Sequence, residues 1–235
     1  VGELNYTVSY NPEFIAQGTI LRDQESPDMV LIGEDNPDVG DIIEEHYRQM
    51  TINEPTICRM SRTEAEITKI SLNSFLTTKI SFANTIGDIV KSAGYEPSKV
   101  LSAIGSDTRV GNKYLGYGYG YGGPCFPRDN RALSLYAKDK NVFALISMAA
   151  DDSNALHLSY QVEEFVKNNS KKEPVIITSV TYKPGTTIIE ESQQLLFAVR
   201  LANKGYRVTI REQKEVVEQV RKLYPNVFKY EVIDE

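Results

Sequence analysis

Apolar and polar positions along the chain fall into three patterns, and the first predicts a mixed α/β segment over residues 1–60. Residues 6–10 have the composition of a strand, and Met29–Ile32 form a short apolar run that ends at a glycine. Residues 38–50 have a helical pattern, and Thr56–Cys58 are typical of a last short strand. These strands are too few for a stable sheet, so we expect its other strands to lie outside this segment.

The second pattern, over residues 61–170, is helical. Ser61 and Glu64 have the spacing of a capping box, and the apolar periodicity that follows predicts one helix over residues 62–93, about 45 Å long at 1.5 Å per residue. Its apolar residues cover more than one narrow stripe, which is typical of a helix buried on several sides at a subunit interface. Shorter helices are predicted over residues 98–104, 127–139 and 142–168.

The third pattern returns to alternating strands and helices over residues 171–235, after a linker at 171–174. The predicted order is strand 175–180, helix 190–203, strand 206–210 and helix 212–223. This β-α-β-α order predicts a parallel, doubly wound sheet that is again incomplete. The predicted fold is therefore α/β, with a central all-helical domain between parts of two doubly wound domains.

Composition narrows the function classes. Hydrophobic residues make up 41% of the 235 residues and charged residues 25%, which excludes disorder as the main state. The net charge of -6 argues against a nucleic-acid or anionic-membrane surface, and no apolar run is long enough for a membrane span. The two cysteines fit a reducing compartment, so we expect a cytoplasmic protein, and their spacing from the two histidines predicts no metal site.

The octapeptide Gly122–Asp129 (GGPCFPRD) carries the strongest chemical signal. Pro127 is typical of the first turn of a helix, which would place Cys125 at a helix N-terminus, where positive partial charge stabilises a thiolate. Arg128 adds positive charge, and Asp129 would orient the site as an acid. A buried, unreactive cysteine beside a Gly-rich turn is the alternative.

Two other polar clusters are candidates for catalysis. Lys69 and Asn73 are four residues apart, so both project from one face of the long helix, where they could stabilise an oxyanion. Glu13 follows a predicted strand and could act as a general base. The alternatives are a solvated helix face and a loop carboxylate in water.

A glycine- and tyrosine-rich segment, residues 111–123, holds six of the chain's 15 glycines. Such a loop can cover a sugar or planar ligand, and a flexible low-complexity turn is the alternative. Lys183 follows a buried strand, where ligands bind in doubly wound folds. We expect neither a Walker loop nor a G-x-G-x-x-G spacing in the chain, so the part that binds a dinucleotide pyrophosphate should lie elsewhere.

Four motifs in order resemble those of the UDP-glucose/GDP-mannose (nucleotide-sugar) dehydrogenase family. Residues 11–18 are similar to its N-P-E-F-L-x-E-G loop, and residues 65–73 to its A-E-x-x-K-x-x-x-N helix. Residues 107–111 with the GGPCFPRD octapeptide resemble its sugar loop and cysteine motif. Residues 182–186 with Glu191-Ser192 resemble its F-K-x-x-T…R-E-S segment.

The resemblance implies three domains. Residues 1–60 would be the end of an NAD-binding Rossmann domain, residues 61–170 a helical dimerisation and catalytic domain, and residues 171–235 the start of a Rossmann-like domain that binds UDP. It also implies NAD as the cofactor and a homodimer, or a higher oligomer, formed through the long central helix. Without a dinucleotide loop, this chain by itself is expected to be inactive.

The implied reaction is the oxidation of a sugar C6 alcohol to a carboxylate through a thiohemiacetal and a thioester on Cys125. Lys69 and Asn73 would stabilise oxyanions, Glu13 would activate water, and Asp129 would assist proton transfer. Arg109 would reach the sugar across a dimer interface. The other implied substrate contacts are Phe14, Tyr114, Leu115, Gly122, Gly123 and Lys183. The implied cofactor contacts are Gln17 and Lys183.

The residues flanking the cysteine favour UDP-glucose as the substrate. Pro124 and Phe126 differ from the G-H-C-I-P-V-D of relatives that act on UDP-N-acetylhexosamines, while GDP-mannose stays an alternative. Gln17 stands where the family usually has a second Glu, which removes one candidate carboxylate. Ile188 and Glu190 stand where an Asp and an Arg are usual, and the loss of that Arg argues against the usual UDP diphosphate contact. A non-catalytic dimerisation or nucleotide-sugar-binding relative is a further alternative, and an unrelated thiol hydrolase is disfavoured because no histidine is near Cys125.

Overall fold

A computed structural model describes residues 6–15 and 18–233 of the chain. The chain divides into two compact units, Val1–Leu72 and Asn73–Glu235. In the part that the structure describes, no helix is long and apolar enough to cross a membrane.

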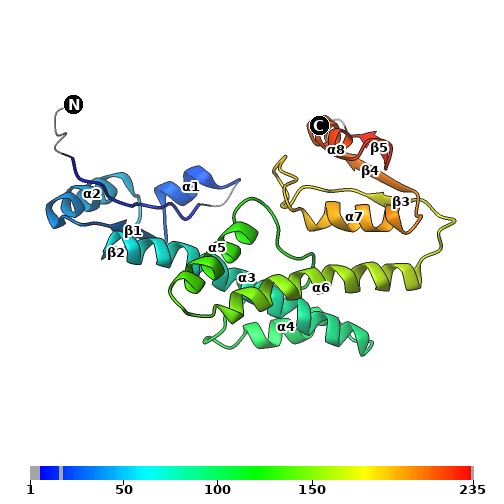
Figure 1. Cartoon of the computed structure of the whole chain (residues 1–235), viewed down its shortest axis with the longest axis horizontal. Helices are drawn as coiled ribbons and strands as arrows, with labels where there is room; N and C mark the ends of the chain where they lie inside the picture. Colours follow the sequence, from blue (N-terminus) through cyan, green and yellow to red (C-terminus); the bar gives the residue numbers. More distant parts are fainter. Residues whose placement is uncertain (1–5, 16–17, 234–235) are drawn as a thin grey trace. The chain divides into compact units, whose positions relative to one another are not determined.

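The first unit contains a small parallel sheet. Strand β1 (Met29–Gly33) pairs in parallel with β2 (Thr56–Met60), and helix α2 (Pro37–Met50) connects them (Figure 1). Asn36 caps α2 by accepting a hydrogen bond from the Asp38 N–H at 2.9 Å, and Pro37 occupies its first turn. The predicted β-α-β order is confirmed.

The strand predicted over residues 6–10 was wrong. Only an isolated antiparallel bridge forms, between Tyr10 and Gly33. One residue further on, the Asn11 side chain donates to the main-chain oxygen of Leu31 at 2.7 Å. A side-chain hydrogen bond therefore replaces the next backbone hydrogen bond of a β-ladder. The short helix α1 (Ile20–Glu25) was not predicted.

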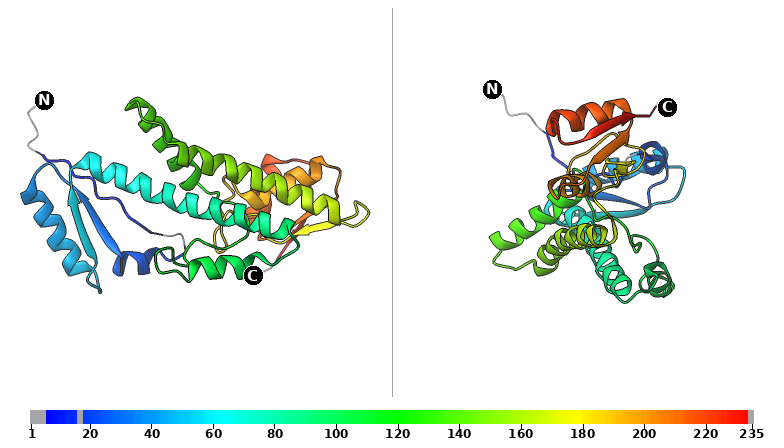
Figure 2. Two further views of the ribbon diagram at one scale, coloured as in Figure 1. Left: turned by 90° about the horizontal axis from the view of Figure 1, so that it is seen from below. Right: turned by 90° about the vertical axis from the view of Figure 1, so that its right-hand side faces the viewer.

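The helical part of the second unit is built around the long helix α3 (Arg62–Ser92), whose first turns belong to the first unit. Helices α4 (Pro97–Gly105), α5 (Phe126–Asp139) and α6 (Leu145–Asn168) complete it. Figures 1 and 2 show α3 and α6 side by side, and Ser81 on α3 donates to the Ala150 oxygen of α6 at 2.8 Å. The predicted helices are confirmed, with ends that differ by a few residues.

Helix α3 buries several polar residues and exposes several large apolar ones. Phe75 is 62% exposed, Phe82 48% and Ile89 61%. Its buried residues include the polar Asn73, Ser74, Thr77, Ser81 and Asn84, together with the apolar Ala65 and Ala83. Within a single chain the helix is therefore not buried on several sides.

The C-terminal part of the second unit is a parallel three-stranded sheet. Its elements are β3 (Val175–Ile177), α7 (Gln193–Asn203), β4 (Val208–Glu212), α8 (Lys214–Leu223) and β5 (Lys229–Val232), with strand order β3-β4-β5. The doubly wound pattern is confirmed, and β5 is an additional strand. Helix α7 begins later than predicted because Glu191 has a φ of 46° and Ser192 caps the helix by accepting from the Leu195 N–H at 3.2 Å.

Candidate functional site

Cys125 is the N-cap residue of α5, which agrees with its predicted place at a helix N-terminus. Its side chain is exposed, and its carbonyl oxygen accepts the first helical hydrogen bond, from the Asp129 N–H at 2.8 Å. The unpaired N–H groups of the first turn give this end of the helix a positive partial charge. The structure therefore contradicts the alternative of a buried cysteine.

Asp129 lies in the first turn of α5, four residues after Cys125, and is only 7% exposed. Its Oδ2 accepts a hydrogen bond from Asn73 Nδ2 at 2.6 Å, and its Oδ1 accepts from Arg128 Nε at 3.0 Å. The Asp129 carboxylate is the main reason why the pKa of Arg128 is raised. Both oxygens of the carboxylate are thus held in fixed directions.

Lys69 lies one helical turn before Asn73 on α3 and contacts the predicted loop of the first unit. Its Nζ donates to the main-chain oxygen of Glu13 at 2.6 Å and lies 4.4 Å from the centre of the Phe14 ring. The Glu13 carboxylate accepts from Gln24 Nε2 at 3.2 Å. The structure thus brings Glu13, Phe14 and Lys69 together, whereas Gln17 lies outside the described residues.

Gly122 and Gly123 pack against the segment of residues 182–192. The Gly123 N–H donates to the Glu190 oxygen at 2.9 Å. A Cβ on Gly123, whose φ is +81°, would lie 2.5 Å from the Tyr182 ring, and one on Gly122 would lie 2.3 Å from the Glu191 main-chain oxygen. These glycines allow the segment of residues 182–192 to approach closely, and their predicted contact with a ligand stays a prediction.

Tyr182 is a neighbour of the thiol that the sequence analysis did not single out. Burial, and then the nearby Cys125, raise the pKa of its hydroxyl. Its position directly before Lys183 in the Tyr-Lys-Pro-Gly motif was the signal that could have identified it.

The remaining predicted substrate contacts lie in different environments. Arg109 is exposed, and its side chain donates two hydrogen bonds of 3.0 and 2.7 Å to Asp107, while its main-chain N–H donates a third at 3.0 Å; these bonds lower the pKa of the Asp107 carboxyl. Tyr114 has a φ of 63°, and its ring packs edge-on against Phe126. The side chain of Leu115 is buried in a small apolar cluster, so a ligand contact there would have to use its backbone.

The turn after β3 holds Lys183 and the departures from the family pattern. The Lys183 carbonyl accepts hydrogen bonds from the hydroxyls of Thr181 and Thr186 at 3.1 and 3.0 Å. The Ile188 oxygen accepts from the Tyr182 N–H at 3.0 Å, and Glu190 adds to the raised pKa of Arg128. At position 190, where the family usually has an arginine, this chain therefore has an acidic side chain that interacts with Arg128.

The expectation of no G-x-G-x-x-G spacing was wrong, because Gly118, Gly120 and Gly123 have it. The segment lies between α4 and α5 and follows no strand. It lacks the strand-turn-helix setting in which this motif binds a pyrophosphate, so it gives no evidence of a dinucleotide loop.

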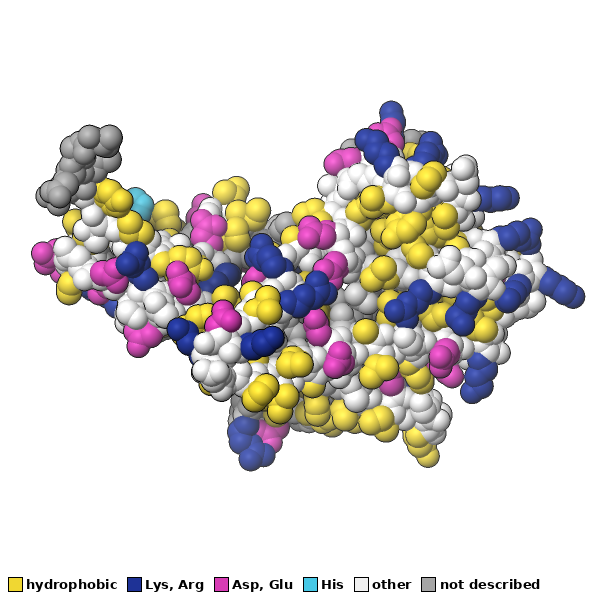
Figure 3. Space-filling model, in the orientation of Figure 1, with side chains coloured by type: hydrophobic (Ala, Val, Ile, Leu, Met, Phe, Trp, Pro, Cys, Tyr) yellow, Lys and Arg dark blue, Asp and Glu magenta, His cyan; other side chains and the backbone are white. Residues whose placement is uncertain are grey.

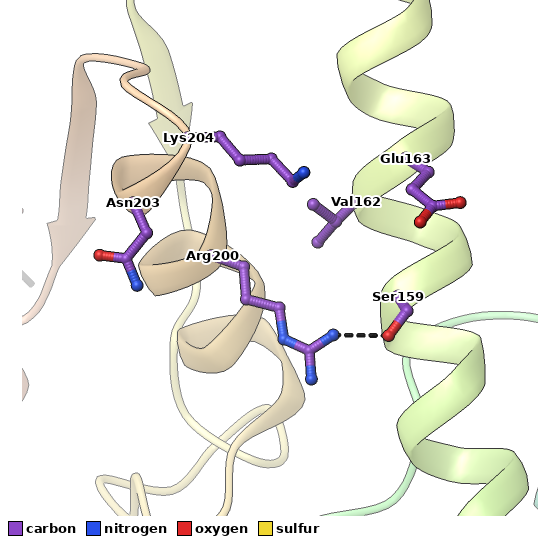
Figure 4. Close-up of a pocket in the computed structure, with 6 residues that line it drawn as sticks. All are labelled: Ser159, Val162, Glu163, Arg200, Asn203 and Lys204. Carbon is purple, nitrogen blue, oxygen red and sulfur yellow. Dashed lines mark hydrogen bonds between the residues drawn. The ribbon is translucent and has the colours of Figure 1, made fainter.

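A cavity of about 300 Å³ lies away from these residues, between α6 and α7 (Figure 4). Its lining residues are Ser159, Val162, Glu163, Arg200, Asn203 and Lys204. Arg200 donates across it to the Ser159 hydroxyl at 2.7 Å. None of the predicted site residues lines it. Among the described residues, no cluster of three or more His, Cys, Asp or Glu side chains is arranged to hold a metal ion.

Parallel β-α-β units precede and follow the helical segment in the chain, which defines an α/β protein with doubly wound parts. Residues 63–156 match the central domain of the UDP-glucose/GDP-mannose dehydrogenase family, and residues 1–51 match its NAD binding domain. The chain belongs to this family. The match to the NAD binding domain confirms NAD as the predicted cofactor.

Curated relatives of two kinds are similar to the chain. It is 33% identical over 204 residues to a UDP-glucose 6-dehydrogenase of Pseudomonas aeruginosa, which covers 86% of the chain and 45% of the relative. It is 30% identical over 212 residues to a GDP-mannose 6-dehydrogenase of Pseudomonas putida, which covers 89% of the chain and 47% of the relative. The chain thus spans about half the length of these relatives.

A solved structure agrees over the whole chain. A UDP-glucose dehydrogenase from the hyperthermophilic archaeon Pyrobaculum islandicum has a TM-score of 0.89 at 29% identity, and the match covers 100% of this chain and 53% of that one. The predicted fold class is confirmed.

Proposed function

We propose that this chain is the central portion of an NAD-dependent enzyme that oxidises the C6 alcohol of UDP-glucose to a carboxylate. The observation that carries the proposal is the exposed Cys125 at the N-terminus of α5, with the buried Asp129 fixed behind it. The domain bounds that we propose are residues 1–60, 61–170 and 171–235. The GDP-mannose 6-dehydrogenases among the relatives supply the alternative substrate.

The described residues fit part of an NAD site. Strands β1 and β2 with α2 form a parallel β-α-β unit, the element that binds nucleotides at the carboxyl ends of its strands. NAD⁺, when bound, would accept a hydride in each of the two oxidation steps. Gln17 and Lys183 are the residues that we propose as cofactor contacts.

Cys125 would act after the alcohol has lost a hydride and a proton to become an aldehyde. The thiolate adds to the aldehyde carbon, and the resulting thiohemiacetal carries a second C–H bond from which a hydride can leave. That loss gives a thioester on Cys125, and water then releases the carboxylate and the thiol. The net change consumes one alcohol, one water and two NAD⁺ and yields one carboxylate, two NADH and three protons.

We propose that the other catalytic residues stabilise negative charge, activate water and transfer protons. Asn73 uses one of its two amide N–H donors for Asp129, and its second donor and the Lys69 cation would stabilise the oxyanions that form at the carbon. Glu13 would activate the attacking water, and Asp129 would assist proton transfer. The proposed sugar and nucleotide contacts are Phe14, Arg109, Tyr114, Leu115, Gly122, Gly123 and Lys183.

The exposed face of α3 supports a homodimer. Phe75, Phe82 and Ile89 are seven residues apart and exposed, which is the spacing of a seam between helices. Figure 3 shows further hydrophobic side chains at the surface of the helical part. We therefore propose that a second copy of the chain covers this face.

The test uses the full-length protein, UDP-glucose and NAD⁺, with NADH followed by its near-ultraviolet absorbance. We expect NADH formation, and we expect Cys125→Ser to abolish turnover while Cys58→Ser, in a half-buried position of β2, preserves it. Undiminished NADH production by Cys125→Ser would contradict the thiol mechanism. Faster turnover of GDP-mannose would correct the substrate. Binding of nucleotide sugars with no NADH from any of them would favour the non-catalytic alternative.

A further inference from the structure

The glycine- and tyrosine-rich loop is fixed by side-chain amides of two helices. Asn84 of α3 accepts from the Gly118 N–H at 3.0 Å and donates to the Tyr119 oxygen at 3.4 Å. Asn154 of α6 accepts from the Tyr121 N–H and donates to the Tyr121 oxygen, both at 2.9 Å. Each side-chain amide thus accepts from one backbone N–H of the loop and donates to one backbone carbonyl. These four hydrogen bonds fix the loop, in contrast to the flexible turn that its composition allowed.

A buried histidine of α6 holds the same loop. His157 is 3% exposed, and its Nε2 lies 2.7 Å from the Gly118 carbonyl oxygen, which also accepts from Gln161 Nε2 of α6 at 3.0 Å. Its Nδ1 lies 2.8 Å from one carboxylate oxygen of Asp88 on α3. The other carboxylate oxygen of Asp88 accepts from the Tyr117 hydroxyl at 2.9 Å.

Both ring nitrogens of His157 therefore face acceptors. The Gly118 carbonyl has no hydrogen to give, and the Asp88 carboxylate is already accepting from Tyr117. A neutral imidazole carries hydrogen on one nitrogen only, so it would leave one acceptor facing another in a buried place. The geometry is satisfied when His157 is an imidazolium and Asp88 is its counter-ion.

The charged and titratable groups around the pair are few. Tyr117 packs edge-on against the His157 ring with a centroid distance of 5.6 Å, and burial, followed by Asp88, raises the pKa of its hydroxyl. Lys91 of α3 lies 5.9 Å from the centre of the Tyr117 ring, and Tyr160 and Glu164 of α6 also act on its hydroxyl. Asp88 is the carboxylate in direct contact with His157.

The loop leads from this pair to the thiol. Tyr121 is 4% exposed, and its hydroxyl donates to Asp151 at 2.5 Å and accepts from Asn130 Nδ2 at 3.2 Å. Asn130 belongs to α5, the helix that Cys125 caps. Displacement of the loop at Gly118 would therefore be transmitted to the cysteine end of α5.

We propose that His157, as an imidazolium paired with Asp88, is a positioning residue that holds the loop of residues 117–121 and through it the Cys125 end of α5. The loop contacts and the protonation of His157 can be tested without any enzyme activity. Only the expected effect on turnover rests on the proposed function. Loss of the Nε2 hydrogen would leave the Gly118 carbonyl with Gln161 as its remaining side-chain donor.

The first experiment uses ¹⁵N NMR at about pH 7.5 to find which ring nitrogens of His157 carry hydrogen. The chain has two histidines, and the exposed His46 is an internal reference. We expect hydrogen on both ring nitrogens of His157. In Asp88→Asn the amide can donate to Nδ1, so a neutral ring with hydrogen on Nε2 only is expected. A neutral His157 ring in the unaltered chain would overturn the proposal.

The second experiment measures hydrogen exchange at the amides of Gly118 and Tyr121. We expect His157→Gln, which can serve only one of the two acceptors well, to raise their exchange rates at least about tenfold, while His46→Gln leaves them unchanged. Asp88→Asn keeps all the hydrogen bonds in a neutral form and serves as the folded comparison. Unchanged exchange in a folded His157→Gln would overturn the positioning role.

The third experiment measures turnover and the alkylation of Cys125 in the full-length protein. We expect His157→Gln to lower kcat more than it raises KM and to slow alkylation of Cys125 less than it slows turnover. If NMR and exchange agree with expectation while no nucleotide sugar is turned over, the proposed function fails and the loop inference stands. If the unaltered enzyme turns over and His157→Gln has full kcat, the link from loop to thiol is wrong.

Discussion

Asn73 on α3 and Asp129 on α5 are joined by a hydrogen bond of 2.6 Å between two largely buried side chains. The bond ties the long helix to the first turn of α5, directly behind the exposed Cys125. A charged acceptor strengthens such a bond, and removal of one partner leaves the other buried without it.

We expect Asp129→Ala to lower the free energy of unfolding by about 1–3 kcal/mol, because it leaves the Asn73 amide without its acceptor. Asn73→Ala should cost a similar amount, and the double variant less than the sum of the two, with a coupling of about 1 kcal/mol. Urea unfolding measures all three. Arg128→Gln is the matched control, because its partner is the same carboxylate but its side chain is 68% exposed, so the cost should be at most about 1 kcal/mol. Strict additivity of the two alanine variants would show that the bond contributes nothing.

The glycines before Cys125 give a second prediction. Gly123→Ala must place a Cβ 2.5 Å from the Tyr182 ring at a φ of +81°, so it should destabilise the chain by about 1–3 kcal/mol. Gly122→Ala should do the same, because its Cβ would meet the Glu191 main-chain oxygen at 2.3 Å. Gly116→Ala, with no atom within 4 Å of the added Cβ, is the control and should be nearly neutral. Thermal melts of the three variants decide, and a Gly123→Ala variant as stable as Gly116→Ala would refute the packing argument.

An ion pair between Arg131 and Glu191 clamps the start of α7 to α5. The two side chains form two hydrogen bonds of 2.7 and 2.9 Å and are 54% and 39% exposed. Because both reach solvent, we expect a double-mutant cycle with Arg131→Gln and Glu191→Gln to give a coupling of at most about 1 kcal/mol. The coupling should shrink between about 0.05 and 0.5 M salt, since screening weakens exposed pairs. A coupling that is insensitive to salt would mean that the two residues interact through packing and not through charge.

The order of most elements was predictable because their local signals agree with the fold. The apolar run Met29–Ile32, the proline at the start of α2 and the capping box at Ser61 act within a few residues of where they stand. The place of Cys125 at a helix N-terminus was predictable for the same reason, from Pro127.

The polar core of the helical part was not predictable from periodicity. The pattern of α3 gives no sign that Asn84 would be buried, or that Phe82 would be exposed, because their partners lie on other elements. The His157–Asp88 pair joins residues 69 positions apart, and the Arg131–Glu191 pair joins residues 60 apart. Such contacts depend on tertiary packing, which overrides local propensity.

The capping box at the start of α3 predicts how stability depends on pH. The Glu64 carboxylate accepts from the Ser61 N–H at 2.9 Å and from its hydroxyl at 2.7 Å, and these bonds lower the pKa of Glu64. A carboxyl whose pKa is lower in the folded state stabilises the fold above its unfolded pKa, about 4.3, and loses that contribution as the pH falls through its folded pKa. Glu64→Ala should therefore melt at a lower temperature than the unaltered chain at pH 7, and the difference should shrink as the pH falls below about 4.

Glu66→Ala, at an exposed position of the same helix, is the control. Glu64→Gln keeps an acceptor that cannot titrate, so its difference from Glu64→Ala should not depend on pH. A melting-temperature gap between the unaltered chain and Glu64→Ala that stays constant down to about pH 3 would show that the carboxylate charge has no part in capping α3.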